Sequence, residues 1–348
     1  MRRAAASTLD WERTPFRDAQ HVRDWSVKRG MGFWVGKSRA LKFFTWYLNF
    51  VLPACFSPIP GNLALVDVGA GIHALGKSAM TANRIHSDDS DSLMFLWTFH
   101  HNASVFAYEA NAQKADELKM AARARPTTSA YASHLDVRTL AVGSTIREVL
   151  LEKCGYPSTF DVKPLESDQT RRKCKSSDRV WQTTLDSEFP VTRRDAWFIL
   201  YVKIDVEGAT LDALSGMQDR LAAHATPLIS VEYALAWSPE FRWRAAVPHE
   251  ARSALQDSLD GFQRRHDALG YDTFLVHAEG SGKVVTLVPV TGRFWSPDME
   301  VCANRSLFYG NFGAWCWNDV LLVSRDAKHA CVRQWVHKHF VGVVASGT

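Results

Sequence analysis

The sequence is short of features that would assign it to a class at once. Its six cysteines form no Cys-x-x-Cys pair and no regular spacing with histidine. A zinc site or a disulfide framework is therefore unfavoured, and reduced thiols are the expectation. The longest apolar stretch, Phe43 to Phe56, contains Asn49 and Pro53 and is shorter than the roughly 20 residues of a membrane span. Nearby basic residues leave membrane-surface association as an alternative that is not favoured. The cysteines are Cys55, Cys154, Cys174, Cys302, Cys316 and Cys331.

The sequence also has little excess charge. Its net charge is +4, and its basic residues are scattered apart from Arg171 to Lys175, so no nucleic-acid partner is predicted. The first residues, Met1 to Ala6, are followed by Trp11, Glu12 and Arg13 rather than by an apolar core. Because this is not the pattern of a signal peptide, a cytoplasmic location is favoured.

What the sequence does contain is an apolar run that meets an acid and a glycine turn. Leu63 to Val68 is apolar without alternation apart from Asp67, as expected of a strand covered on both faces in a parallel sheet. Gly69 and Gly71 let the backbone bend and approach a ligand closely. From Ile72 the apolar spacing predicts a helix whose first amides point at that ligand. These features predict a nucleotide-type site, with a plain buried turn as the alternative.

Two cofactors compete for this turn. The spacing Gly69-x-Gly71-x-x-Ala74 fits the dinucleotide pattern, which also needs an acid about 20 residues further on. The nearest acid at a predicted strand end, Glu109, lies well beyond that distance. Asp67 would repel the pyrophosphate of NAD but would favour the cationic methionine end of S-adenosylmethionine. The turn therefore favours S-adenosylmethionine over a nicotinamide cofactor.

Predicted strands alternate with helices along the chain, which indicates an α/β fold with a mostly parallel sheet. The last three predicted strands have no long helix between them and predict an antiparallel edge. The predicted domains are an aromatic-rich helical extension (1–60), a main domain (61–325) with a polar, mobile insertion (156–179), and a C-terminal amphipathic helix (326–348). The predicted strands are 63–68, 104–109, 135–142, 198–205, 228–232, 273–277, 284–288 and 318–323.

Acidic residues follow several of these strands, where a doubly wound sheet binds its ligand. Glu109 is placed to accept two hydrogen bonds from a ribose diol, or alternatively to cap the helix predicted from Ala110. Asp205, Glu207 and Glu232 end or follow two later strands and would place three carboxylates around one pocket. Their spacing does not demand a metal ion.

Four separated stretches follow one pattern. They are Val66-Asp67-Val68-Gly69-Ala70-Gly71, Ala141-Val142-Gly143, Thr184-Leu185-Asp186 and, most specifically, Val202-Lys203-Ile204-Asp205-Val206-Glu207-Gly208-Ala209 with Leu214 and Gly216 behind it. Together, over about residues 61 to 325, they resemble the FkbM family of S-adenosylmethionine-dependent methyltransferases. The resemblance implies the Rossmann-like class I methyltransferase fold, with a mostly parallel seven-stranded sheet and helices on both faces. Gly71 and His73 stand where the family commonly has Asn and Gly.

The resemblance also implies an activity. Members of the family mostly methylate hydroxyl oxygens of sugars and natural products. The expected reaction is therefore O-methylation of a sugar or small metabolite, with S-adenosylmethionine as cofactor. Carried onto this chain, Asp67, Gly69 and Gly71 would contact the methionine end of the cofactor and Glu109 its ribose, while Asp205 would lie near the methyl group.

A hydroxyl acceptor benefits from a base, because it is a poor nucleophile until its proton leaves. We expect Asp205, Glu207 or Glu232 to accept this proton, with His73 as a weaker candidate. The alternative for Glu207 and Glu232 is a structural role in the loops that follow their strands.

The acceptor, a small molecule or a glycan, is expected to meet the aromatic segment from Phe294 to Trp317, helped by Trp237 and Trp243, although such rings more commonly serve in packing. Two other functions stay open on the sequence alone. One is a non-catalytic binding protein with the methyltransferase fold, and the other is an NAD-dependent oxidoreductase.

Overall fold

The protein has a mixed α/β fold. The computed structural model describes residues 20, 48–71, 90–99, 103–124, 126–153, 160–164, 177–193, 196–206, 209–234, 259–279, 284–294 and 317–341. The chain divides into two compact units, one of residues 48–226 and the other of residues 1–47 together with 227–348. The predicted domain boundaries at residues 60 and 325 stay predictions.

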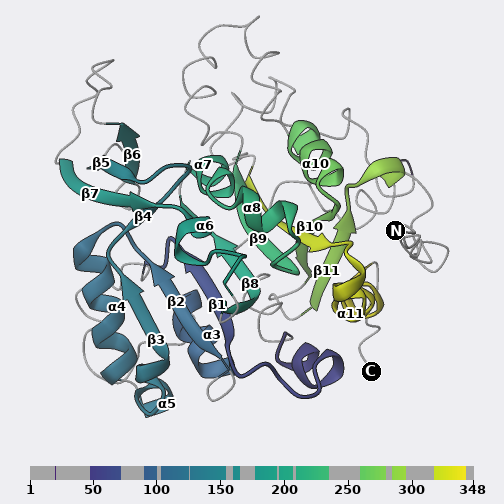
Figure 1. Ribbon diagram of the computed structural model, residues 1–348, viewed down its shortest axis with the longest axis horizontal. Coiled ribbons are helices and arrows are strands. Elements are labelled where there is room, and N and C mark those ends of the chain that lie inside the picture. Colours follow the sequence, from purple (N-terminus) through teal and green to yellow (C-terminus); the bar gives the residue numbers. More distant parts are fainter. Residues whose placement is uncertain are drawn as a thin grey trace, which may run out of the picture. The chain divides into compact units, whose positions relative to one another are not determined.

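A parallel sheet forms the centre of the unit 48–226. Its strands lie in the order β8 (Phe198–Ile204), β1 (Leu63–Val68), β2 (Ser104–Tyr108) and β3 (Leu135–Arg138), and every neighbouring pair is parallel (Figure 1). All six residues of β1 are buried, as its continuous apolar run predicts. The strands predicted near residues 63, 104 and 198 are thus confirmed, and the seven-stranded sheet stays a prediction.

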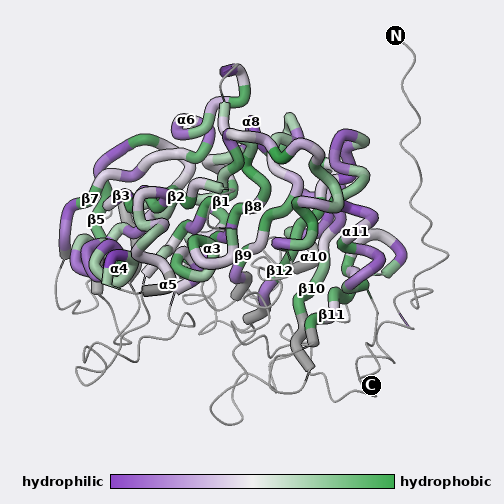
Figure 2. The backbone as a smooth tube through the Cα atoms, turned by 90° about the horizontal axis from the view of Figure 1, so that it is seen from below, coloured by the Kyte–Doolittle hydropathy of each residue, from purple (hydrophilic) through white to green (hydrophobic). Residues whose placement is uncertain are grey.

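Helices cover both faces of these strands. Figure 2 shows α3 (Asp91–Phe99), α4 (Ala112–Ala124) and α5 (Pro126–Ser129) on one side, with α6 (Leu185–Glu188) and α8 (Gln218–Ala222) on the other. Helix α3 packs against β1 and β2, and seven of its nine residues are buried. Helix α4 instead buries a single stripe, because its small apolar residues recur at helical spacing.

A second, smaller sheet in the same unit corrects two predictions. It contains β4 (Ala141–Val142), β7 (Ser177–Thr183), β5 (Arg147–Lys153) and β6 (Phe160–Pro164), in that order. The predicted strand 135–142 is therefore two strands, β3 and β4, in different sheets. The predicted mobile insertion 156–179 contributes β6 and the start of β7. The polar composition of this segment does not predict strands. The strands form because they pair with β5, which supplies the buried apolar residues Val149 and Leu151.

The chain after β8 forms two short helices rather than one long helix. Helix α7 (Thr210–Ser215) ends at Gly216, and α8 follows it. A Cβ on Gly216 would lie 1.9 Å from the carbonyl oxygen of Gly143, so no larger residue fits this junction. The carboxylate of Asp186 accepts hydrogen bonds from the backbone N–H groups of Asp219 (2.9 Å) and Arg220 (3.1 Å) at the start of α8. These motif residues therefore hold α6, α7 and α8 together.

The other unit contains antiparallel strands, as predicted for the end of the chain. They are β9 (Leu228–Ala234), β12 (Trp317–Ser324), β10 (Tyr271–Glu279) and β11 (Val284–Pro289), in that order. The unit also holds α10 (Leu259–Ala268), the short turns η7 (Gly292–Phe294) and η11 (Ala327–His329), and α11 (Ala330–Phe340). Asp272 at the start of β10 binds Arg333 of α11 at 2.8 Å, which anchors that helix.

The expectation of reduced thiols is wrong for the two cysteines that the described residues contain. Cys55 and Cys331 are both disulfide-bonded. Sequence spacing reveals only local pairs, whereas a disulfide needs Cα atoms that are close in space. The location expected from the sequence stays a prediction.

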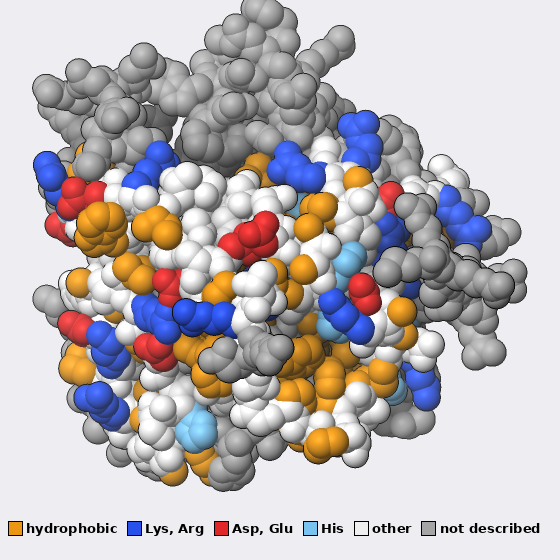
Figure 3. Space-filling model, in the orientation of Figure 1, with side chains coloured by type: hydrophobic (Ala, Val, Ile, Leu, Met, Phe, Trp, Pro, Cys, Tyr) orange, Lys and Arg blue, Asp and Glu red, His pale blue; other side chains and the backbone are white. Residues whose placement is uncertain are grey.

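No helix in the part of the chain that the structure describes is both long and apolar enough to cross a membrane. The face of the molecule shown in Figure 3 carries acidic and basic side chains side by side, in keeping with the small net charge.

His266 of α10 gives the unit that contains it a pH-dependent stability. Its side chain is 1% exposed, and its Nδ1 lies 2.8 Å from the carbonyl oxygen of Phe262, so Nδ1 carries the proton that is donated. Burial lowers the pKa of His266 to about 4. The unfolded chain takes up a proton below about pH 6.5 and the folded chain does not, so folding stability falls as the pH drops from about 6.5 to 4.

We expect His266 to account for about 3 kcal/mol of stability lost across that pH range, which follows from about 1.4 kcal/mol per pKa unit. His266→Gln keeps an N–H donor for the Phe262 carbonyl but does not titrate. Urea unfolding of both proteins at a series of pH values should therefore give a flatter dependence for the variant. Parallel curves for the two proteins would contradict the assignment.

Candidate active site

The turn after β1 joins the ends of three neighbouring strands. The N–H groups of Gly69 and Ala70 both donate to the carbonyl of Tyr108 at the end of β2, at 2.9 and 3.0 Å, and the N–H of Asp205 donates to the carbonyl of Val68 at 2.9 Å. Gly69 has a φ of 81°, and a Cβ there would lie 1.8 Å from the carbonyl oxygen of Asp205. Only glycine fits this conformation and this contact.

A buried lysine lies beside the turn, surrounded by carboxylates. The Nζ atom of Lys203 on β8 is 2.8 Å from Asp91, 3.2 Å from Asp205 and 3.4 Å from Asp67. Asp67 lies opposite Lys203 in the register of β1 with β8, and Asp91 begins α3. The hydroxyl of Ser92 also donates to Asp67, at 2.5 Å. The lysine thus connects β1, β8 and the start of α3.

The electrostatics of this cluster keep the lysine charged. Burial lowers the pKa of Lys203, but the combined attraction of Asp205, Asp67 and Asp91 outweighs it and raises the pKa well above the ordinary value. For Asp67 the largest effect is burial, which raises its pKa, and the charge of Lys203 opposes this. With all three acids ionised, one positive and three negative charges leave a surplus of negative charge.

The three carboxylates differ in access to solvent. The side chain of Asp205 is 22% exposed, that of Asp91 13% and that of Asp67 0%. Asp205 is therefore the carboxylate most open to solvent, whereas the side chain of Asp67 is closed off from it. Within the described residues, no group of three or more His, Cys, Asp or Glu side chains is arranged to hold a metal ion.

Glu109 follows β2 and lies against the second glycine of the turn. Its Oε1 accepts a hydrogen bond from the N–H of Asn111 at 2.8 Å, and a Cβ on Gly71 would lie 2.7 Å from its Oε2. Burial raises the pKa of Glu109, opposed by the Asn111 N–H and by Lys114. The side chain of Asn111 accepts from the N–H of Lys114 at 2.9 Å, so Asn111 and not Glu109 caps α4.

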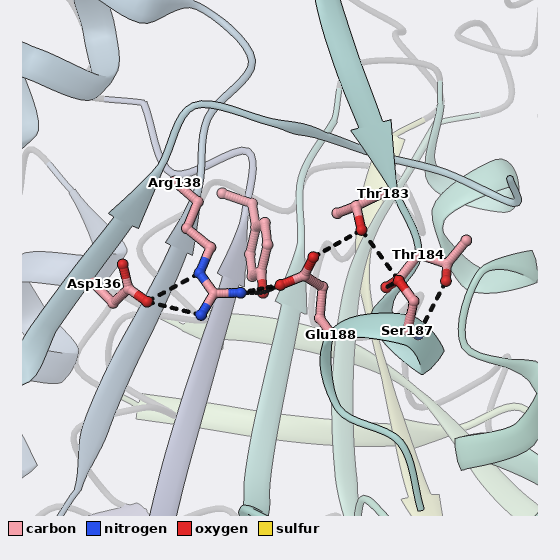
Figure 4. A network of polar contacts seen from close by, with 7 residues as sticks. Asp136, Arg138, Thr183, Thr184, Ser187 and Glu188 are labelled. Atoms are coloured by element: carbon pink, nitrogen blue, oxygen red, sulfur yellow. Dashed lines mark hydrogen bonds and ion pairs between the residues drawn. The ribbon is translucent and has the colours of Figure 1, made fainter. Parts of the chain in front are cut away.

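A polar network fixes the end of β2 next to Glu109 (Figure 4). Arg138 on β3 binds the carboxylates of Asp136 and Glu188. Glu188 also accepts hydrogen bonds from the hydroxyls of Tyr108, at 3.2 Å, and Thr183, at 2.8 Å. The network therefore ties α6 and β7 to the strand ends that carry the turn.

The structure brings together the five predicted cofactor-binding residues. Asp67, Gly69, Gly71, Glu109 and Asp205 all lie at the ends of β1, β2 and β8. Their roles toward a cofactor stay predictions.

The structure describes the other predicted residues only in part. Glu232 belongs to the second unit, where it faces Asp319 in the register of β9 with β12. Glu207 and His73 lie outside the described residues, as does the aromatic segment from Trp295 to Cys316 with Trp237 and Trp243. Phe294 is 2% exposed, in agreement with packing, which was the alternative role for these rings.

Sequence reasoning missed Lys203, Asp91 and Ser92 as parts of this site. The signal for Lys203 is its place in the otherwise apolar strand Phe-Ile-Leu-Tyr-Val-Lys-Ile, because a buried lysine needs acidic partners. The sequence offers no comparable signal for Asp91 and Ser92, which read as a polar loop and the start of a helix.

Three comparisons with known proteins bear on the chain. A family model described as the methyltransferase FkbM domain matches residues 67–289. Among solved structures, cofactor-bound Rv0187 from MTB matches with 10% sequence identity and a TM-score of 0.35, covering 88% of this chain and 89% of that chain. No curated protein matches the chain significantly.

The two glycines of the turn should respond differently to substitution. In Gly69→Ala the new Cβ meets backbone that cannot move aside and the φ is positive, so we expect a loss of roughly 3 kcal/mol of folding stability or more. In Gly71→Ala the new Cβ meets the ends of the Glu109 and Lys114 side chains, which can shift, so the loss should stay below about 1 kcal/mol. Urea unfolding measures both values, and equal losses would contradict this difference.

Proposed function

Because the chain belongs to the family of FkbM methyltransferase domains, we propose that it transfers a methyl group from S-adenosylmethionine to a hydroxyl oxygen of a sugar or small metabolite. The single observation that supports this most is the convergence of Asp205 and Glu109 on the turn at Gly69. In open α/β sheets, ligands bind outside the carboxyl ends of the strands, which is where these two residues lie.

The residues of the turn fit the proposed cofactor. Gly71 lets the Oε2 atom of Glu109 pack directly against the turn, since a Cβ at position 71 would lie 2.7 Å from it. Glu109 is only 8% exposed, so hydrogen bonds from a ribose diol would meet a carboxylate that water solvates poorly. The surplus negative charge around Lys203 favours a cationic ligand and disfavours a pyrophosphate.

Asp205 is the proposed proton acceptor. When bound, S-adenosylmethionine supplies a methyl group on a sulfonium that a nucleophilic oxygen can attack. Asp205 takes the proton of the acceptor hydroxyl as the oxygen forms its bond to the methyl carbon, while the bond from that carbon to sulfur breaks and a neutral thioether leaves. Its backbone is fixed by the hydrogen bond to Val68, and its side chain is the most exposed of the three carboxylates around Lys203. Glu207 and Glu232 stay candidates for the same role.

Two substitutions separate cofactor binding from turnover. Glu109→Gln keeps an acceptor for the Asn111 N–H but loses the charge, so we expect S-adenosylmethionine affinity to fall by about tenfold or more. Its folding stability should not decrease, because burial of the charged form is what raises the pKa of Glu109. Asp205→Asn should lower the affinity less than Glu109→Gln does, and it should lower turnover by about 100-fold or more.

Calorimetry with S-adenosylmethionine measures affinity, and formation of S-adenosylhomocysteine in the presence of cell extract and of a panel of hydroxylated sugars measures turnover. Asp116→Asn, an exposed carboxylate on α4, is the matched control and should change neither quantity. Absence of S-adenosylmethionine binding by the unmodified protein would overturn the proposal, and full turnover by Asp205→Asn would remove Asp205 from it.

A further inference from the structure

Lys203 has more acidic partners than its burial requires. Its side chain is 7% exposed, and carboxylates from β1, α3 and the end of β8 all lie within 3.4 Å of its ammonium. One or two carboxylates would satisfy a buried ammonium, and an apolar residue would avoid the cost of burying charge altogether. Three carboxylates are more than one ammonium needs for neutralisation, and burying these charges costs desolvation energy. The arrangement is therefore better explained by the effect of the ammonium on the carboxylates.

Among these partners, Asp205 is the one whose position matters to a ligand. Asp67 is fully buried and has Ser92 as a further partner. Asp205 is more exposed than Asp67 or Asp91, and its backbone is held by Val68 and packed against Gly69. The contact of its Oδ2 with Lys203 at 3.2 Å therefore fixes the side chain of a residue whose backbone is already fixed.

We propose that Lys203 is a positioning residue of the methyl-transfer site, whose ammonium holds the Asp205 carboxylate in place to accept the proton of the acceptor hydroxyl. This inference rests on the proposed function. Lys203 lies in a strand and its ammonium is anchored at Asp67 and Asp91, so it presents Asp205 from a rigid support. Its positive charge also favours the ionised form of Asp205, the form that can accept a proton.

The test must separate positioning from net charge and from folding. Lys203→Met removes the ammonium and leaves three carboxylates without their cation, of which Asp67 is fully buried, so this variant risks misfolding. The double variant Lys203→Met with Asp91→Asn removes one positive and one negative charge, so the net charge of the cluster is unchanged. Comparing it with Asp91→Asn alone isolates the loss of the ammonium. Lys203→Arg restores a positive charge, and Asp116→Asn serves as the unaffected control.

We expect the double variant to fold, to bind S-adenosylmethionine within about threefold of Asp91→Asn, and to lose about 100-fold or more in kcat. The acid limb of its kcat profile should move to higher pH by about one unit, because Asp205 has lost the nearby cation. Lys203→Arg should recover at least about tenfold of that loss. Circular dichroism, calorimetry and S-adenosylhomocysteine formation at a series of pH values measure these quantities.

A folded double variant with the kcat and pH profile of Asp91→Asn would overturn the inference. A loss of cofactor affinity as large as the loss of kcat would also overturn it, because Lys203 would then act in binding. Both results presuppose an active unmodified protein. Failure of that protein to bind S-adenosylmethionine or to form S-adenosylhomocysteine is instead the failure of the proposed function.

Discussion

The ion pairs of one buried lysine shape the turn on which the site is built. Lys203 reaches carboxylates on β1, on α3 and after β8, elements that lie far apart in the sequence. Because a buried charge without partners is far more costly than one with them, these elements can pack only where all their charged groups meet. That requirement brings the end of β8 against the end of β1, and the backbones then approach so closely that position 69 must be glycine.

In the unit that contains residues 227–348, the charges are reversed, because a buried carboxylate is surrounded by basic side chains. Asp272, which is 1% exposed, lies 2.8 Å from Arg333, 3.6 Å from His337 and 3.9 Å from Arg325. Arg325 also pairs with Asp267, so two guanidinium groups face two carboxylates and the charges balance. Such a balanced cluster anchors a helix but exerts little electrostatic attraction on a ligand. With its three acids ionised, the cluster around Lys203 is unbalanced, and it is partly exposed, as the proposed cationic cofactor requires.

Local sequence patterns predict those parts of the fold that depend on residues close together in the sequence. A continuous apolar run before two glycines suffices to place β1 and its turn, and the acid at Glu109 marks the end of β2. The patterns failed where the decisive partner is distant. Strand β7 begins in a polar stretch, and its partners Val149 and Leu151 belong to the separate strand β5. Likewise, no spacing rule pairs Lys203 with Asp91. Disulfides at Cys55 and Cys331 were missed for the same reason.

The charges of the proposed reaction explain why an acidic cluster and not a neutral pocket stands at this turn. In the proposed step Asp205 takes up one proton, which lowers the surplus negative charge of the cluster by one. In the same step the cofactor loses the positive charge of its sulfonium. One negative and one positive charge of the site therefore cancel in the step, and the products carry no separated charges. A neutral base would instead end the step positively charged beside a neutral thioether, and beforehand it would not attract the cationic cofactor. An acceptor hydroxyl, which releases a proton as it is methylated, matches an anionic base held by a buried cation.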